Sequence, residues 1–253
     1  MTFTRRMRLW AAVMVFAALQ AGAAPCAELK IFGSRVTRMM IDDIGAQFER
    51  ETGFKPVVVT DVAAVMKRRI ESGEPFDLAV LVNFQTDDLI KSGKLVADSR
   101  ADIMKAGIGV AVRRGAAKPD ISTVEAFRRT LLAAKSITYL KEGASTIHLD
   151  KVFARLGITD AIRAKTVQPT TESVSEKVAD GEVELGIIVI PNILSVKGAE
   201  LVGPIPDEVN SYIMFTAGVS AASPNQAAAR AMIKLLTGPV GIPAIKAKGM
   251  EPG

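Results

Sequence analysis

Polar side chains gather at two places in the sequence where a strand-like run leads into a predicted helix. Ser34 and Arg35 follow the strand-like segment at residues 28–32, and Ser145 and Thr146 begin a second helical pattern. The first backbone N–H groups of a helix lack intrahelical partners, and the positive end of the helix dipole lies beside them, so they can bind an anion. Serine and threonine are also common N-cap residues. These hydroxyls are therefore expected either to cap their helices or to contact a bound anion.

Arg35 indicates an acidic ligand more specifically than the hydroxyls do. A helix N-terminus disfavours a cation, because the helix dipole already places partial positive charge there. An arginine at this position either extends into solvent or binds an acidic ligand bidentately with its guanidinium fork. We expect Arg35 to contact the ligand, and an organic acid is favoured because the fork matches a carboxylate.

Motifs for other kinds of chemistry are missing from the sequence. There is no phosphate-binding glycine loop, dinucleotide fingerprint or nucleophile elbow. One histidine and one cysteine cannot form a His- or Cys-rich metal centre, so we expect no metal and no cofactor. His148 lies in a predicted helix, where a lone histidine is more often a packing residue than a base. Aromatic residues are few and basic residues scattered, which argues against a nucleic-acid partner. We assign no catalytic residue.

Residues 1–27 are predicted to be a secretory signal peptide. Three arginines precede an apolar run at residues 9–19, which is shorter than the roughly 20 residues of a membrane span, and small residues follow. Cleavage after Ala27 and cleavage after Ala23 both remain open. A proline before Cys26 argues against a lipoprotein. Without this segment, which contains no acidic residue, the net charge falls from +5 to +2, so the basic excess belongs mostly to the leader.

Beyond the leader, strand-like and helix-like segments alternate along the chain. The β-branched run at residues 56–60 is typical of a buried parallel strand, and helical patterns end at glycines such as Gly53. This alternation predicts an α/β fold with mostly parallel sheets, whose ligands lie beyond the carboxyl ends of the strands. We expect strands at residues 28–32, 56–60, 76–82, 107–112, 136–140, 184–190 and 209–219, and helices at 37–52, 62–72, 86–92, 123–133, 145–156, 173–180, 225–236 and 238–248.

The elements are expected to form two doubly wound α/β lobes with a ligand cleft between them. The first lobe would combine residues 28–107 with residues 219–253, and the second would comprise residues 108–218. The strands near residues 108–112 and 212–218 would cross between the lobes as a hinge. No heptad pattern or long amphipathic stripe indicates a partner subunit, so we expect a monomer.

Several segments resemble the periplasmic molybdate-binding protein family, the type II solute-binding components of ABC transporters. The most specific piece is I-E-x-G-x-P-x-D-L at residues 70–78. Further similarity lies at residues 30–48, 149–160 and 184–188 and in the closing KAKGMEPG, so the resemblance covers nearly all of the mature chain. It implies a periplasmic protein of two α/β lobes, a small anionic ligand in the cleft and an ABC permease of the inner membrane as partner.

The resemblance weakens at the loops with which family members bind molybdate. A family serine falls at Val36, a serine-rich loop falls at Val62 and Ala63, and a tyrosine falls at Val189. Three hydroxyl donors of the family pattern are thus replaced by apolar side chains, which favours an organic acid over a molybdate-like oxyanion. The residues expected at the ligand are Ser34, Arg35, Val62, Ala63, Ser145, Thr146, Thr171, Pro191 and Asn192.

Three functions remain open at this stage. The favoured one is a binding protein that delivers a small anion, either an organic acid or a molybdate-like oxyanion, to an ABC permease. The second is a periplasmic isomerase of an unsaturated tricarboxylate, similar to aconitate isomerase, on the same scaffold. Its proton transfer would need a base, for which His148, Asp61 and Glu172 are candidates. The third is a sensor domain or partner-binding protein without transport.

Overall fold

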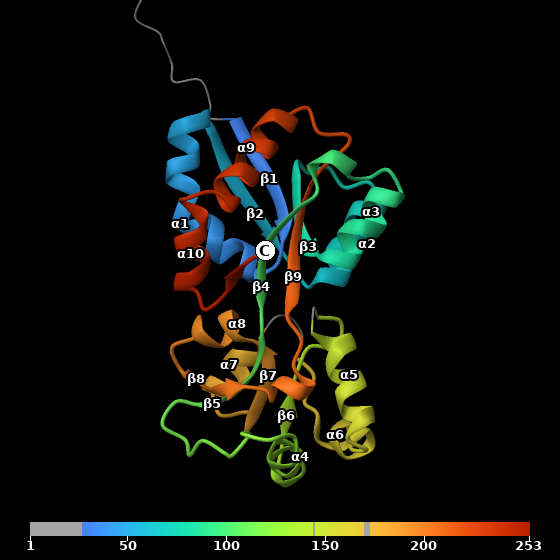
Figure 1. Ribbon diagram of the computed structural model, residues 1–253, viewed down its shortest axis with the longest axis vertical. Coiled ribbons are helices and arrows are strands. Elements are labelled where there is room, and N and C mark those ends of the chain that lie inside the picture. Colours follow the sequence, from blue (N-terminus) through green and yellow to red (C-terminus); the bar gives the residue numbers. More distant parts are fainter. Residues whose placement is uncertain (1–26, 144, 170–172) are drawn as a thin grey trace, which may run out of the picture.

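A computed structural model describes residues 27–143, 145–169 and 173–253, which form two lobes stacked along the long axis of the molecule (Figure 1). The first lobe contains a sheet of strand order β10-β4-β9-β3-β1-β2, and the second contains a sheet of order β6-β7-β5-β8. The predicted two-lobed α/β architecture is confirmed.

The strands and helices have the following bounds. The strands are β1 (Ala27–Gly33), β2 (Phe54–Thr60), β3 (Leu78–Val82), β4 (Ala101–Ala106), β5 (Ile108–Arg113), β6 (Ile137–Thr138), β7 (Leu185–Val189), β8 (Ala199–Pro204), β9 (Ile213–Val219) and β10 (Glu251–Pro252). The helices are α1 (Arg35–Thr52), α2 (Ala63–Glu71), α3 (Asn83–Lys91), α4 (Val124–Ala133), α5 (Thr146–Arg155), α6 (Thr159–Lys165), α7 (Val174–Ala179), α8 (Ile190–Leu194), α9 (Gln226–Thr237) and α10 (Gly241–Ala247).

The first sheet is covered on both faces, because its central strand β3 buries successive side chains on alternate sides. Leu78 and Val80 belong to the large core that includes α1 and α9, whereas Ala79 and Leu81 pack with Met66 of α2 in a second core. Figure 1 shows α1, α9 and α10 on one side of this sheet and α2 and α3 on the other. The parallel strands β1, β2 and β3 lie between these layers, with their carboxyl ends toward the second lobe (Figure 1).

The described chain passes from one sheet to the other at two places. Gly107 alone separates β4 from β5, and residues 205–212 lead from β8 back to β9. The two expected crossing strands exist, but each belongs to a single sheet, since β5 pairs with β7 and β8 whereas β9 pairs with β3 and β4. The boundary expected at residues 218–219 is therefore corrected to a point before Ile213, because the ladder hydrogen bonds of β9 are made within the first sheet.

The sheets are mixed rather than mostly parallel. β9 runs antiparallel to β3 and β4, and β5 runs antiparallel to both of its neighbours. β4, β8, α6 and α8 were not predicted, and the strand expected at residues 136–140 is reduced to β6. β4 has the half-exposed sequence ADIMKA and β8 contains glycine and proline, so neither shows the continuous apolar run of a buried strand.

Candidate functional site

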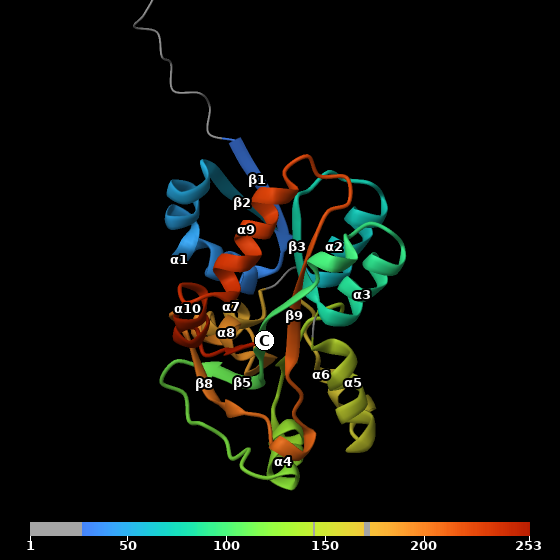
Figure 2. The ribbon, with the colours of Figure 1, turned by 45° about the horizontal axis from the view of Figure 1, so that its top comes forward.

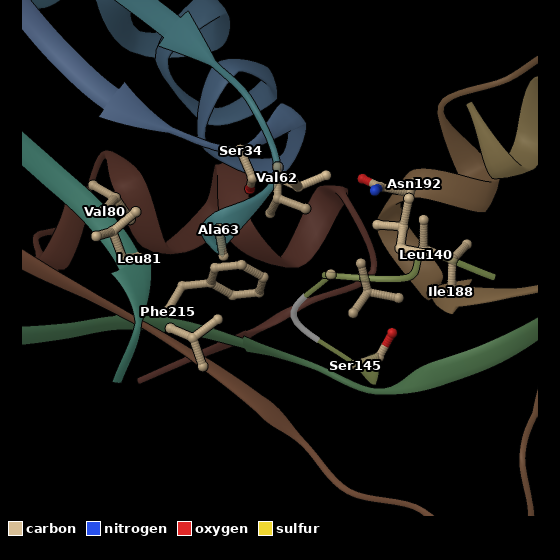
Figure 3. Close-up of a pocket in the computed structure, with 14 residues that line it drawn as sticks. Ser34, Val62, Ala63, Val80, Leu81, Leu140, Ser145, Ile188, Asn192 and Phe215 are labelled. Atoms are coloured by element: carbon tan, nitrogen blue, oxygen red, sulfur yellow. The ribbon is translucent and has the colours of Figure 1, made fainter. Parts of the chain in front are cut away.

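A pocket lies between the two lobes, beyond the carboxyl ends of the parallel strands of the first sheet (Figure 3). The first lobe contributes the residues that follow β1 and β2, the end of β3 and one residue of β9. These are Ser34, Val36, Val62, Ala63, Val80, Leu81, Val82 and Phe215. The second lobe contributes the loop before α5, the end of β7 and α8, through Leu140, Gly143, Ser145, Ile188, Val189 and Asn192.

The pocket combines apolar walls with a few polar groups. Ten of the fourteen described lining residues have apolar side chains, and the others are Ser34, Gly143, Ser145 and Asn192. The centre of a water molecule can occupy about 20 Å³ of this space, which is room for roughly one ordered water. A ligand of several heavy atoms therefore requires the lobes to part or the lining side chains to move.

Two of the polar side chains in the pocket lack a hydrogen-bond partner in the described part of the chain. Asn192 is 3% exposed and its Oδ1 atom is unpaired, and the buried Oγ atom of Ser34 is unpaired as well. In Figure 3 the amide of Asn192 points from the second lobe toward Val62 of the first. An unsatisfied buried polar group costs about 1–3 kcal/mol. Ser34 and Asn192 are thus the groups that a bound ligand would stabilise most directly.

The turn between β1 and α1 fixes Ser34 at the mouth of the pocket. The Ser34 N–H donates to Thr37 Oγ1 at 3.3 Å. A Cβ atom at Gly33 would lie 2.5 Å from this same Oγ1 atom, so the turn needs glycine there. Ser34 and Thr37 form a capping box, in which the Ser34 Oγ atom faces the Thr37 N–H without a bond of full hydrogen-bonding geometry among the described residues. The Ser34 hydroxyl hydrogen can therefore still donate to a ligand.

In the loop before α5, Thr146 and Ser145 have different roles. The Thr146 hydroxyl donates to the Leu140 carbonyl at 2.7 Å and accepts from the Gly143 N–H at 2.8 Å, so it holds the loop together. Ser145 is 3% exposed and lines the pocket. Thr146 does not belong to the described lining of the pocket, and its position indicates a structural role.

Arg35 binds an acidic group, but that group belongs to the protein. Its Nη1 atom donates to Oε1 of Glu176 in α7, so this ion pair joins the first lobe to the second. A second ion pair between the lobes links Arg68 of α2 to Glu142 at 3.1 Å. Arg35 is absent from the described lining of the pocket and lies next to Ser34 at its edge.

The lobes also touch through apolar contacts away from the pocket. Figure 2 shows α10 of the first lobe beside α8 of the second, and Gly249 after α10 lies close to Leu194 and Ile190 of α8. These contacts and the two ion pairs hold the lobes in the arrangement that makes the pocket small.

The remaining predicted residues fall outside the pocket as described. Pro191 begins α8 without lining the pocket, and Thr171 and Glu172 lie outside the described residues. His148 Nε2 is 2.7 Å from the Val209 carbonyl oxygen, and Asp61 Oδ1 accepts from the Val62 N–H at 2.8 Å. His148 and Asp61 therefore have structural partners.

Sequence reasoning missed several lining residues. Val80, Leu81 and Val82 end a buried parallel strand, and the rule that ligands lie beyond such strand ends would have found them. Phe215 comes from β9, which enters the first sheet antiparallel between β3 and β4. No local pattern in the sequence shows that placement.

Within residues 27–143, 145–169 and 173–253, no group of three or more His, Cys, Asp or Glu side chains is arranged to hold a metal ion. No helix among these residues combines the length and apolar character that crossing a membrane requires.

Two α/β lobes with a pocket between them are the architecture of a solute-binding protein, and comparison with known proteins agrees. A model of the family described as bacterial extracellular solute-binding protein matches residues 29–251, and the chain belongs to this family. The chain is 31% identical over 236 residues to an aconitate isomerase of a Pseudomonas species, covering 91% of this chain and 90% of that protein.

Molybdate-binding proteins are similar to this chain over nearly their whole length. The molybdate-binding protein ModA of Azotobacter vinelandii is 28% identical over 251 residues, covering 94% of this chain and 95% of ModA. The solved periplasmic molybdate-binding protein of the same organism superposes with a TM-score of 0.74 at 18% identity, covering 88% of this chain and 98% of that one. The predicted resemblance to this family is confirmed.

Proposed function

We propose that this solute-binding protein encloses a small organic acid between its lobes and delivers it to an ABC permease. The observation that carries the proposal is the lining of the pocket. A tetrahedral oxyanion is held by donors on every side, whereas most of this lining is apolar and suits the carbon skeleton of an organic acid. The hydroxyl of Ser34 and the amide of Asn192 would bind its polar groups.

Arg35 supplies positive charge at the edge of this pocket. A guanidinium carries five N–H donors, so it can bind a ligand carboxylate beside the Glu176 carboxylate or exchange one for the other. In either case the acid would bind where α1 begins, and the N-terminal dipole of this 18-residue helix favours an anion there.

We further propose that residues 1–27 are removed and that the mature protein is a monomer in the periplasm. The support is the leader pattern together with membership of an extracellular solute-binding family. N-terminal sequencing and size-exclusion chromatography of protein from the cell envelope test this part. An intact Met1 in a cytoplasmic fraction, or a stable dimer, would contradict it.

Calorimetric titration tests the choice of ligand class. Citrate, malate and cis-aconitate are compared with molybdate and sulfate, and at least one acid is expected to bind more tightly than either oxyanion. We expect the ligand-free protein to open in solution so that the acid can enter, and the bound acid to shift it back toward the closed arrangement. Small-angle scattering should therefore show a smaller radius of gyration with the tightest ligand than without it. Molybdate or sulfate binding more tightly than every acid would overturn the proposal.

An isomerase is the second candidate, favoured by the 31% identity to an aconitate isomerase over 91% of this chain. Incubating the protein with cis-aconitate or trans-aconitate and following the vinyl proton by NMR tests it directly. A change of one isomer into the other, at a rate proportional to protein concentration and absent after heat denaturation, would establish turnover. Unchanged spectra beside measurable binding would leave the transport function.

A further inference from the structure

The pocket contains an acceptor that the described chain leaves unpaired. The Oδ1 atom of Asn192 is buried in a residue only 3% exposed, and no donor from the residues that the structure places reaches it. An amide carries one acceptor oxygen and two N–H donors. Turning the amide over exchanges these atoms and still leaves an acceptor oxygen on the same side chain.

This acceptor distinguishes between classes of anion. An ionised carboxylate only accepts hydrogen bonds, and so does a fully ionised tetrahedral oxyanion. Either can accept from the hydroxyl of Ser34, whose Oγ atom is also without a partner in the described chain, but neither can donate to Asn192 Oδ1. A bound ligand that satisfies both side chains must therefore carry a donor of its own beside the negative charge.

We propose that the ligand is a hydroxy acid, with its hydroxyl donating to Asn192 and a carboxylate accepting from Ser34. This inference rests on the proposed function, that the ligand is an organic acid, and names the acid's second functional group. A hydroxyl is the donor that fits, because an ammonium group would need an anionic partner, whereas Asn192 is neutral. The apolar side chains of Val62 and Ile188 lie against the carbon skeleton between the two polar groups.

The arrangement makes Asn192 a specificity-determining residue. A site built to bond a substrate hydroxyl strongly rejects the analogue that lacks it, because the protein's buried polar group is then left unpaired. Asn192 is already buried without a described partner in the absence of a ligand, so part of this cost is present before binding. We therefore expect at least a tenfold preference for a hydroxy acid over its deoxy analogue.

Matched ligands isolate the hydroxyl in a calorimetric experiment. Malate, aspartate and succinate differ at one carbon by a hydroxyl, an ammonium group or hydrogen, and citrate differs from propane-1,2,3-tricarboxylate only by its hydroxyl. The whole mature protein is titrated with all five ligands, and with molybdate and sulfate. The variant Asn192→Leu keeps the approximate shape of the side chain and removes its acceptor.

Thr138→Val is the matched control variant. Thr138 of β6 is fully buried and its hydroxyl also lacks a partner in the described chain, but it does not belong to the described lining of the pocket. Both variants thus remove an unpaired buried polar atom from the second lobe, and only one of them changes the pocket. Circular dichroism and thermal unfolding show that each variant is folded.

We expect the wild type and Thr138→Val to bind the hydroxy acid of each pair at least tenfold more tightly than its deoxy analogue. We expect Asn192→Leu to lose that preference. Equal affinities within both pairs, tighter binding of aspartate than of malate, or an unchanged preference in Asn192→Leu would each overturn the inference and leave the organic-acid function standing. Molybdate or sulfate binding more tightly than every acid would overturn the proposed function, and the inference with it.

Discussion

Buried polar side chains are hydrogen-bonded at one end of the first sheet, and in the described chain a buried hydroxyl at the other end is unpaired. At the amino ends of β1 and β3, Asp77 is 6% exposed and its carboxylate is fully engaged. It accepts from the Lys30 backbone N–H at 2.7 Å, from the Ser223 hydroxyl at 2.5 Å and from the Asn225 amide at 3.2 Å. At the carboxyl ends, the hydroxyl of Ser34 is buried without a partner among the described residues.

Charged side chains at the amino end are paired in the same way. Glu74 accepts from Arg69 Nε at 2.6 Å and from Arg69 Nη2 at 2.7 Å, and Lys30 Nζ donates to Glu74 Oε1 at 3.1 Å. Arg69 also lies over the ring of Phe32, which stacks on Phe76. These residues bond to one another within the lobe.

The difference shows which polar residues stabilise the fold and which are available to a ligand. The segment at residues 70–78, the most specific part of the family resemblance, contains Glu74 and Asp77 and lies at the end of the sheet away from the pocket. Its residues form a bonded structural network. Ser34 and Asn192 are the two residues of the described pocket lining that have a buried polar atom without a partner in the described chain.

Breaking the network at the amino end should have the largest effect on stability. Asp77→Ala removes a buried charged acceptor and leaves the Lys30 N–H, the Ser223 hydroxyl and the Asn225 amide short of a partner. We expect a loss of about 3 kcal/mol in the free energy of unfolding, measured in urea. Asn192→Leu is the contrasting variant and should stay within about 1 kcal/mol of wild type. A larger loss in Asn192→Leu than in Asp77→Ala would contradict the comparison.

Much of this fold is predictable from the sequence because the parallel strands carry unbroken apolar runs. LAVLV in β3 and LGIIV in β7 are buried on both faces, and such runs between helical patterns indicate an α/β lobe. β4 and β8 are not predictable in this way, because their residues are partly exposed and their apolar runs are interrupted by charge, glycine or proline. The position of β9 in the first sheet depends on pairing with strands more than a hundred residues earlier. The hydrophobic periodicity of the local sequence does not show such a pairing.

The site was predictable to the extent that it follows strand ends. Ser34, Val62 and Ala63 were expected from the first two strand–helix loops, and all three line the pocket. Arg35 was expected to meet a ligand carboxylate, which stays a prediction, and its observed partner is Glu176 of the protein itself, 141 residues along the chain. A pairing between lobes cannot be read from the local sequence, since it depends on how the lobes meet.

Two variants separate the possible roles of the Arg35 ion pair. If Arg35 also binds a ligand carboxylate, Arg35→Ala should weaken acid binding at least tenfold, about 1.4 kcal/mol, whereas Glu176→Gln should not weaken it. The pair itself is partly exposed and contributes at most about 1 kcal/mol to holding the lobes together. Calorimetric titration of both variants with the tightest acid measures the difference. Equal losses in the two variants would assign Arg35 to joining the lobes alone.

Two helix caps provide a smaller test of the same distinction. The Thr123 hydroxyl accepts from the Ala126 N–H at 3.1 Å, whereas the Ser34 Oγ atom only faces the Thr37 N–H in its capping box, without a bond of that geometry in the described chain. Thr123→Ala should therefore lower the free energy of unfolding by about 1 kcal/mol, the usual value of a cap, and Ser34→Ala by less than about 0.5 kcal/mol. Urea unfolding of the ligand-free proteins compares them. If Ser34→Ala lowers the free energy of unfolding by as much as Thr123→Ala does, the Ser34 hydroxyl acts as a cap of α1.

The smallest expected effect is a pH dependence at the amino end. Hydrogen bonds from Arg69, with a further contribution from Lys30, lower the pKa of Glu74 from its ordinary value of 4.5 to about 2. Because the folded-state pKa is the lower one, the stabilisation by Glu74 is fully present above pH 4.5 and is lost as the pH falls toward 2. The difference in unfolding free energy between wild type and Glu74→Gln should therefore shrink across this interval. It should also shrink in about 1 M salt, because exposed charges are screened there. A difference that stays constant from pH 6 to pH 2, by urea unfolding at each pH, would show that Glu74 contributes through packing rather than through its charge.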